Sequence, residues 1–189
     1  MTAPIRQRNA ATTRETILAA AHHRFLLDGY DHAVLRAIAA DAGVDAALIC
    51  RYFGSKELLF AEVLASAGRD PMQVITGDRA TFGRRVAEEM LRPTDHRPDR
   101  LAFVQLAIRS STSPVASKLV RARIESQFIV PFTLWLGGEH AAEKAWLAGS
   151  ILMGAAAMLA IDCAPPSGAS QDALIDQLAD TLQRVIDRD

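Results

Sequence analysis

The chain has few cysteines, few aromatic residues and almost no net charge. Its 189 residues include two cysteines, 6% aromatic residues and a formal net charge of −1. Cys50 and Cys163 cannot build a disulfide framework, and no C-x-x-C or Cys/His cluster indicates a metal site. We therefore expect no metal and no cofactor, and a reducing, cytoplasmic location.

Signals for catalysis and export are also missing. The sequence has no glycine-rich phosphate loop and no G-x-S-x-G nucleophile motif. His22 and His23 are neighbours on a predicted helix and point about 100° apart, which does not suit a shared metal ion. The N-terminus carries arginines but no apolar stretch, so it is not a signal peptide. We predict no catalytic residues and no enzyme activity.

What the chain does have is alanine, leucine and helical periodicity. Half of its residues are hydrophobic and β-branched runs are absent, which favours an all-α fold. We expect residues 1–13 to form a mobile arm, 71–77 a linker, and 93–98 a loop. About nine helices are predicted: 14–28, 34–41, 45–52, 55–68, 78–91, 99–111, 113–136 with a break at Pro131, 139–163, and one from a Ser170 cap to about 185.

One segment raises the question of a membrane span. Residues 145–161 contain no charged side chain, a run of 17 residues. A spanning helix needs about 20 residues and is usually richer in leucine and isoleucine than in alanine and glycine. A helix that is apolar on all sides is usually buried in protein. We predict no membrane association.

The most informative segment is 29–60, which has the spacing of a helix-turn-helix followed by a third helix. Leu35, Ile38, Ala39 and Ala42 recur at helical spacing, and Gly43 can take the positive φ that ends a helix in a tight turn. Asp45 is a good N-cap for the next helix. Two short helices joined in this way present the second one to the DNA major groove.

Charge placement around this corner agrees with a DNA-binding role. Residues 1–56 hold seven Lys or Arg against five Asp or Glu, whereas the remainder holds 14 against 17. We expect residues of the second helix to contact base edges or to cap that helix, and the cations around it to contact DNA phosphates. The predicted DNA-binding residues are Arg6, Arg8, Arg36, Asp45, Ala46, Ala47, Arg51, Tyr52 and Lys56.

The segment 14–64 resembles the N-terminal domain of the TetR family of bacterial transcription regulators. The matching residues are Ile17, Ala20-Ala21, Phe25, Gly29-Tyr30, Ile38-Ala39, Ala42-Gly43-Val44, Tyr52-Phe53, Ser55-Lys56-Glu57 and Leu59. The chain departs from the family pattern at Ala33-Val34, where a capping threonine is common, and at Cys50, where tyrosine is common. We expect Asp31 or His32 to replace the missing cap.

The resemblance implies a domain plan and a function. Residues 1–56 would form the arm and the helix-turn-helix domain, 55–68 a connecting helix, and 72–189 a helical effector-binding and dimerisation domain. The implied protein is a repressor that binds a palindromic operator in double-stranded DNA as a homodimer and is released by a small, mainly apolar effector. A helical protein-interaction module, or a constitutive DNA binder without an effector, stays open as an alternative.

Two further sets of residues follow from this plan. Big, adaptable apolar side chains suit an effector pocket, although any helical core contains them too. The candidate effector residues are Phe82, Met90, Phe103, Arg109, Phe128, Phe132, Trp135 and Met153. Helices 139–163 and 170–185 are expected to form the dimer interface, unless they simply pack in the monomer core. The candidate interface residues are Trp146, Gly149, Gly154, Leu174, Leu178 and Leu182.

Overall fold

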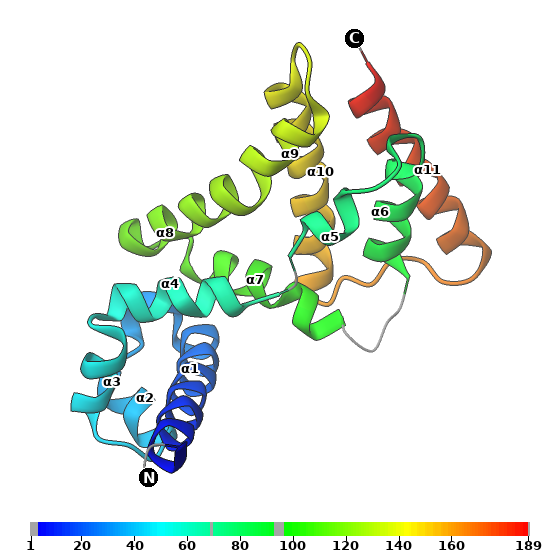
Figure 1. Ribbon diagram of the computed structural model, residues 1–189. Helices are drawn as coiled ribbons and strands as arrows, with labels where there is room; N and C mark the ends of the chain where they lie inside the picture. The colour runs from blue at the N-terminus through cyan, green and yellow to red at the C-terminus, as the bar shows by residue number, and fades with distance from the viewer. Residues whose placement is uncertain (1–3, 69, 93–96, 189) are drawn as a thin grey trace. The chain divides into compact units, whose positions relative to one another are not determined.

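Helices form all of the regular secondary structure that can be described (Figure 1). The computed structural model describes residues 4–68, 70–92 and 97–188, with side chains over 10–68, 70–92 and 101–188. No β-strand occurs in these ranges, so the all-α prediction is confirmed. The chain divides into a first unit, residues 1–67 with 106–120, and a second unit, residues 68–105 with 121–189. The domain plan predicted from the sequence places residues 106–120 in the C-terminal domain.

The first unit contains four N-terminal helices and parts of two later ones. These are α1 (Pro4–His32), α2 (Leu35–Asp41), α3 (Ala46–Phe53) and α4 (Lys56–Ser66), with the end of α7 (Arg97–Ser110) and the start of α8 (Pro114–Ile124). The prediction of a mobile arm over 1–13 is wrong for residues 4–13, because α1 already begins at Pro4, and residues 1–3 lie outside the described residues. Proline suits the first turn of a helix, and Ala10 and Ala11 are strong helix formers.

Aromatic rings form the centre of the first unit. Phe25 and Phe60 are fully buried, and Tyr30 is 5% exposed. The rings of Phe25 and Tyr30 each meet Phe60, with centroids 4.9 and 5.0 Å apart, in edge-to-face arrangements. Two ion pairs tie α1 to its neighbours: Arg14 pairs with Glu62 on α4, and Arg24 pairs with Asp41 on α2. The hydrogen bond with Arg24 lowers the pKa of the Asp41 carboxyl.

The second unit contains the remaining elements. These are α5 (Met72–Ile75), a 3-10 turn (Arg79–Thr81), α6 (Phe82–Leu91), the start of α7, a π-helical turn (Glu125–Ile129) that follows α8, α9 (Val130–Leu136), α10 (Ala141–Ala160) and α11 (Ala169–Asp187). Helices α6 and α11 pack very closely. A Cβ atom added to Gly83 would lie 2.1 Å from the carbonyl oxygen of Ala179, so only glycine permits this approach.

Four details of the predicted helices differ from the structure. The loop expected over 93–98 is wrong for residues 97 and 98, because α7 begins at Arg97, and residues 93–96 lie outside the described residues. The expected linker 71–77 contains α5, whose C-terminal carbonyls are bound by the guanidinium of Arg85 on α6. The break expected at Pro131 is a π-helical turn ahead of α9, and the proline then occupies the first turn of α9, where no intrahelical N–H is needed. Ser170 is not the cap of α11, because Gly168 is the N-cap residue.

The charge-free segment forms most of α10. None of the helices in the described ranges is long and apolar enough to cross a membrane.

Candidate nucleic-acid interface

The corner between α2 and α3 has the geometry of a helix-turn-helix. Gly43 adopts φ 65° in the turn, a conformation that side chains rarely take. The Asp45 side chain accepts a 2.7 Å hydrogen bond from the Ala47 amide and caps α3 as predicted. At the start of α2 the cap residue is Val34, which makes no side-chain bond, so the prediction that Asp31 or His32 caps this helix is wrong. The Asp31 carboxylate instead accepts from Ser113.

Helix α3 has one buried face and one exposed face. Ile49 and Phe53 are buried, whereas Ala47 and Arg51 are exposed. Ala46 and Tyr52, which the sequence placed on the outward side, are only partly exposed. Cys50 shares the exposed face with Ala47 and Arg51. The sequence analysis did not select Cys50, although its position three residues after Ala47 is the helical spacing that could have identified it.

Lys56, at the start of α4, is held in place by its neighbours. Its ammonium lies 4.6 Å from the centroid of the Tyr30 ring and donates a 3.3 Å hydrogen bond to the carbonyl oxygen of Asp31. Partial burial lowers the pKa of Lys56, and the carboxylates of Asp31 and Glu57 oppose this shift. Burial, together with Glu57, raises the pKa of Tyr30 to about 12. The Lys56 ammonium carries three N–H donors. Its hydrogen bond to Asp31 uses one of them, so donors are left for an anion.

The other predicted phosphate contacts are partly described. The Arg36 side chain is exposed on α2. The side chains of Arg6 and Arg8 lie outside the described residues.

The predicted effector residues do not gather at one place. Phe82, Phe128, Phe132 and Trp135 form one cluster in the second unit, with centroids of the contacting rings 5.4–5.8 Å apart. Met90, Phe103 and Met153 are partly buried in this unit. Arg109 belongs to the first unit and is exposed, so it is not a buried charge that needs a ligand.

Most of the predicted dimer residues contact their own chain. Leu182 is fully buried, and Leu174 and Leu178 pack against the core shared with α6. A Cβ atom at Gly149 would lie 2.6 Å from the Phe128 ring, so this glycine faces inward. Trp146 is 66% exposed, and nothing lies within 4 Å of a Cβ atom at Gly154. Only these two residues of the set lie on a free outer surface of α10.

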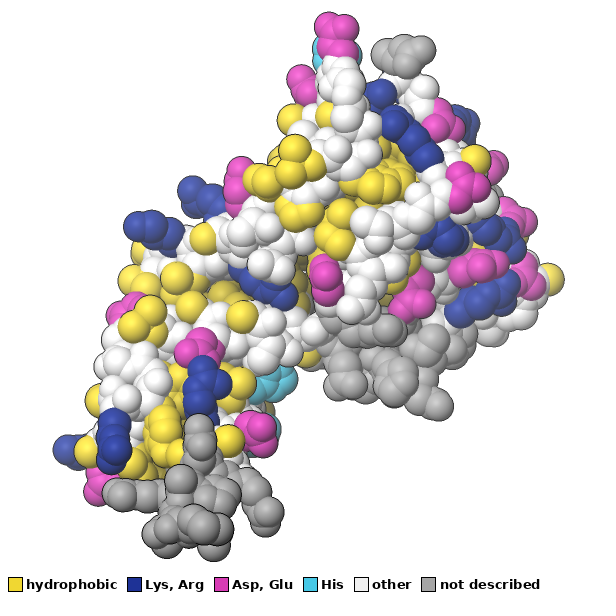
Figure 2. Space-filling model, in the orientation of Figure 1, with side chains coloured by type: hydrophobic (Ala, Val, Ile, Leu, Met, Phe, Trp, Pro, Cys, Tyr) yellow, Lys and Arg dark blue, Asp and Glu magenta, His cyan; other side chains and the backbone are white. Residues whose placement is uncertain are grey.

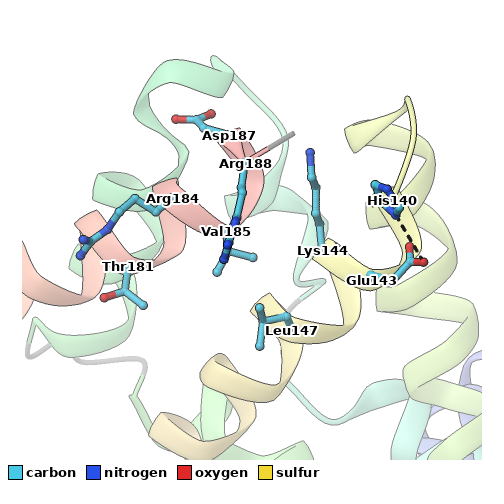
Figure 3. Close-up of a pocket in the computed structure, with 9 residues that line it drawn as sticks. All are labelled: His140, Glu143, Lys144, Leu147, Thr181, Arg184, Val185, Asp187 and Arg188. Atoms are coloured by element: carbon cyan, nitrogen blue, oxygen red, sulfur yellow. Dashed lines mark ion pairs between the residues drawn. The ribbon is translucent and has the colours of Figure 1, made fainter.

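An open groove lies in the second unit between α10 and α11 (Figure 3). It has a volume of about 740 Å³. It is lined by His140, just before α10, by Glu143, Lys144 and Leu147 from α10, and by Thr181, Arg184, Val185, Asp187 and Arg188 from α11 and the residue after it. Figure 2 shows hydrophobic side chains in this region with Lys and Arg beside them. None of the predicted effector residues lines the groove.

A helix-turn-helix with an exposed second helix and nearby cations defines a DNA-binding protein. Family models match in both parts of the chain: the model described as bacterial regulatory proteins, tetR family, over residues 17–63, and the model described as tetracyclin repressor-like, C-terminal domain, over residues 80–186. The chain belongs to the TetR family of bacterial regulatory proteins. It is a DNA-binding transcriptional regulator.

Solved structures of TetR-like proteins share the fold over nearly the whole chain. A TetR-family regulator from Streptomyces coelicolor A3 is 26% identical, with a TM-score of 0.57 and coverage of 93% of this chain and 94% of that one. NalD, the secondary repressor of the MexAB-OprM multidrug efflux pump in Pseudomonas aeruginosa, is 18% identical, with a TM-score of 0.71 and coverage of 93% and 96%. A transcriptional regulator from Rhodococcus sp. Rha1 is 19% identical, with a TM-score of 0.65 and coverage of 90% and 96%. No curated protein matches the sequence.

Proposed function

We propose that the protein is a repressor that binds a pseudo-palindromic operator as a homodimer, with α3 in the major groove. The observation that carries this proposal is the division of α3 into a buried face and an exposed face that holds Ala47, Cys50 and Arg51. Arg51 is the one long donor on this face, and a guanidinium can bind guanine O6 and N7 together. Ala47, beside it, is suited to a thymine methyl group. Ala46 and Tyr52 lie at the edges of this surface.

Phosphate contacts would position α3 on the duplex. Lys56 and Arg36 provide these contacts from the described residues, and Arg6 and Arg8 extend them along α1. The Asp45 cap contributes by fixing the start of α3 rather than by touching an anion. Each lysine or arginine that neutralises a phosphate releases counterions, so affinity falls steeply with salt concentration.

The proposed dimer surface is the outer face of α10. Trp146, Ser150, Gly154 and Met158 follow one another at intervals of four residues, and Ile161 continues the row beyond the helix. Trp146, Met158 and Ile161 are 66%, 51% and 65% exposed, which is unusual for large apolar side chains on a surface without a partner. Two-fold pairing of this face would let small residues bring two copies of α10 together and cover the large ones.

Analytical ultracentrifugation tests the dimer surface. Trp146→Glu should shift the protein to monomer at micromolar concentration and weaken operator binding, because a buried charge without a partner is costly. Leu134→Glu is the matched control, since Leu134 on α9 is 77% exposed and lies outside the proposed surface. Equal dissociation in both variants, or none in either, would contradict the assignment to α10.

The effector is proposed to be a small, mainly apolar molecule that enters the second unit. The supporting feature is a set of partly buried, adaptable side chains in this unit: Met90, Phe103 and Met153, together with Phe128 and Trp135 of the four-ring cluster. The close contacts among the four rings favour a second candidate, a DNA binder without an effector, since a ligand would have to separate these rings. Such a ligand regulates only if it prefers one of two packings, and each 1.4 kcal/mol of preference changes DNA affinity about tenfold.

Tryptophan fluorescence distinguishes the two candidates. In Trp146→Phe only Trp135 remains as a tryptophan. A panel of uncharged aromatic compounds should contain members that change the Trp135 emission and, at the same concentrations, release labelled duplex DNA. Emission changes without DNA release, or no saturable change from any compound, would favour the constitutive DNA binder.

A further inference from the structure

Helix α1 is broken at Gly29, and the break sets the direction of the next two residues. Gly29 adopts φ 71° and ψ 173° inside the span of α1. A Cβ atom there would lie 3.2 Å from the carbonyl oxygen of Arg109, close to the end of α7. A residue with a side chain would be strained by the backbone conformation and crowded by this carbonyl. Beyond the break, Tyr30 enters the core and Asp31 lies at the surface.

Asp31 accepts hydrogen bonds from two parts of the first unit, one through its side-chain carboxylate and one through its backbone carbonyl. Its carboxylate accepts a 2.8 Å hydrogen bond from the Ser113 hydroxyl, in the corner between α7 and α8. Its backbone carbonyl accepts the hydrogen bond from Lys56. Ser113 is only 2% exposed, and its oxygen also accepts a 3.4 Å bond from the Ala116 amide in the first turn of α8. The Ser113 hydroxyl is therefore used as both donor and acceptor.

The Asp31 carboxylate is also a competitor for the Lys56 ammonium. It interacts electrostatically with Lys56 and acts to raise the pKa of that lysine, as does Glu57. A carboxylate and a phosphate bind an ammonium through the same charge-assisted hydrogen bonds. While Ser113 holds the carboxylate, Lys56 contacts Asp31 through the neutral carbonyl and keeps donors for a phosphate. A released carboxylate would be free to turn onto Lys56.

We propose that Ser113 is a positioning residue for DNA binding, which holds the Asp31 carboxylate away from Lys56 and so keeps this lysine available to a DNA phosphate. The inference rests on the proposed phosphate role of Lys56. It gives the second unit a way to act on DNA affinity, because α7 begins in that unit and α8 ends in it, with the Ser113 corner between them. A shift of this corner that breaks the bond from Ser113 to Asp31 weakens the phosphate contact.

Five single variants test the proposal on a random-sequence DNA duplex, titrated over a range of salt concentrations. A phosphate contact does not depend on sequence, so no operator is needed. Ser113→Ala should bind about two- to fivefold more weakly, the range of one exposed ion pair, and should show a shallower salt dependence. Asp31→Asn keeps an acceptor for Ser113 and removes the competing charge, so it should bind about two- to fivefold more tightly.

Ser110→Ala is the matched control for Ser113→Ala. Ser110 is 1% exposed in the same corner, and its hydroxyl has no hydrogen-bond partner among the described residues. Its removal should leave DNA binding unchanged. Glu15→Gln, an exposed neutralisation on α1, measures the general effect of removing one negative charge from the first unit. The tightening by Asp31→Asn should exceed that of Glu15→Gln.

Combination with Lys56→Ala shows whether the effects pass through Lys56. Lys56→Ala alone should flatten the salt slope by about one unit. In its presence, Ser113→Ala should have no further effect and Asp31→Asn should act like Glu15→Gln. NMR titration supplies an independent readout: the pKa of the Lys56 ammonium should rise in Ser113→Ala, as the released carboxylate pairs with it, and fall in Asp31→Asn.

Different results would overturn the phosphate role of Lys56 and the positioning role of Ser113. An unchanged salt slope in Lys56→Ala would overturn the phosphate role of Lys56 and this inference with it. A normal loss in Lys56→Ala, combined with Ser113→Ala that binds like Ser110→Ala, would overturn only the positioning role. If Ser113→Ala proves unfolded, Asp31→Asn decides alone: tightening no greater than in Glu15→Gln, or tightening that persists with Lys56→Ala, contradicts the proposal.

Discussion

Lys56 in the first unit and two arginines in the second unit, Arg79 and Arg85, are bound in different ways. In the first unit Arg14 and Lys56 lie over aromatic rings, 5.0 Å from the centroid of Phe53 and 4.6 Å from that of Tyr30. In the second unit Arg79 donates to the carbonyls of Leu136 and Ile186, and Arg85 donates to carbonyls between residues 74 and 78.

This difference indicates a division of work. A cation above a ring is held in place without losing all of its N–H donors, so it can still bind an anion. A guanidinium bonded to several carbonyls has fewer donors left and ties helix ends together. Lys56 of the first unit thus keeps donors for an anion, whereas Arg79 and Arg85 fix the helix ends of the second unit. The contrast applies to these side chains, because Arg14 and Arg24 of the first unit also tie helices together, through Glu62 and Asp41.

The largest expected effect is at Gly83 in the second unit. Gly83→Ala should lower the free energy of unfolding by about 3 kcal/mol, because the new methyl group meets the backbone of α11, which cannot move without separating the helices. Gly149→Ala should cost about 1 kcal/mol, because the neighbouring Phe128 ring is a side chain that can turn. Urea unfolding measures both. Equal losses in the free energy of unfolding would mean that the backbone of α11 moves as easily as the Phe128 ring.

In the first unit the corresponding weak point is the cap of α3. Asp45→Ala should lower the free energy of unfolding by about 1 kcal/mol, since the Ala47 amide loses its acceptor. Asp45→Ser keeps a capping oxygen and should retain most of the stability. If both variants lose the same amount, the carboxylate stabilises α3 through its charge rather than through the cap.

The smallest predicted effect depends on pH and concerns the pair of Arg24 and Asp41. Hydrogen bonding to Arg24 lowers the pKa of Asp41, so the pair stabilises the folded state above the ordinary pKa of an aspartate and loses this effect as pH falls through the lowered value. Asp41→Asn should therefore melt below wild type near neutral pH and together with it in strong acid. A difference in melting temperature that persists in acid would assign the effect to packing.

The helix-turn-helix could be predicted from sequence because its signals are local. Gly43 ends one helix, Asp45 caps the next, and Ser55 caps α4 by accepting from the Leu58 amide. Each of these residues acts within three positions of itself. The apolar spacing of residues 35–42 likewise predicted a buried face for α2, as Ile38 and Ala39 show.

Features that depend on distant residues escaped the sequence analysis. Helix α5 is stabilised by Arg85 from the next helix, and Asp31 is engaged by Ser113 rather than by the start of α2. The sequence places Leu174, Leu178 and Leu182 either at a dimer interface or in the monomer core. Leu182 is buried, and Leu174 and Leu178 are partly buried against the core shared with α6 of the same chain. A periodic apolar pattern predicts that one face of a helix is buried, but it does not predict which other helix covers that face.

The central claim is that α3 reads DNA bases through its exposed face. The most direct test compares the affinity of wild type and Arg51→Ala for duplex DNA from the protein's own upstream region and for a random duplex, at one fixed salt concentration. The account predicts a loss of about 1–3 kcal/mol on the upstream DNA and a much smaller loss on the random duplex. An equal loss on both would make Arg51 a phosphate contact and would contradict base reading by this face of α3.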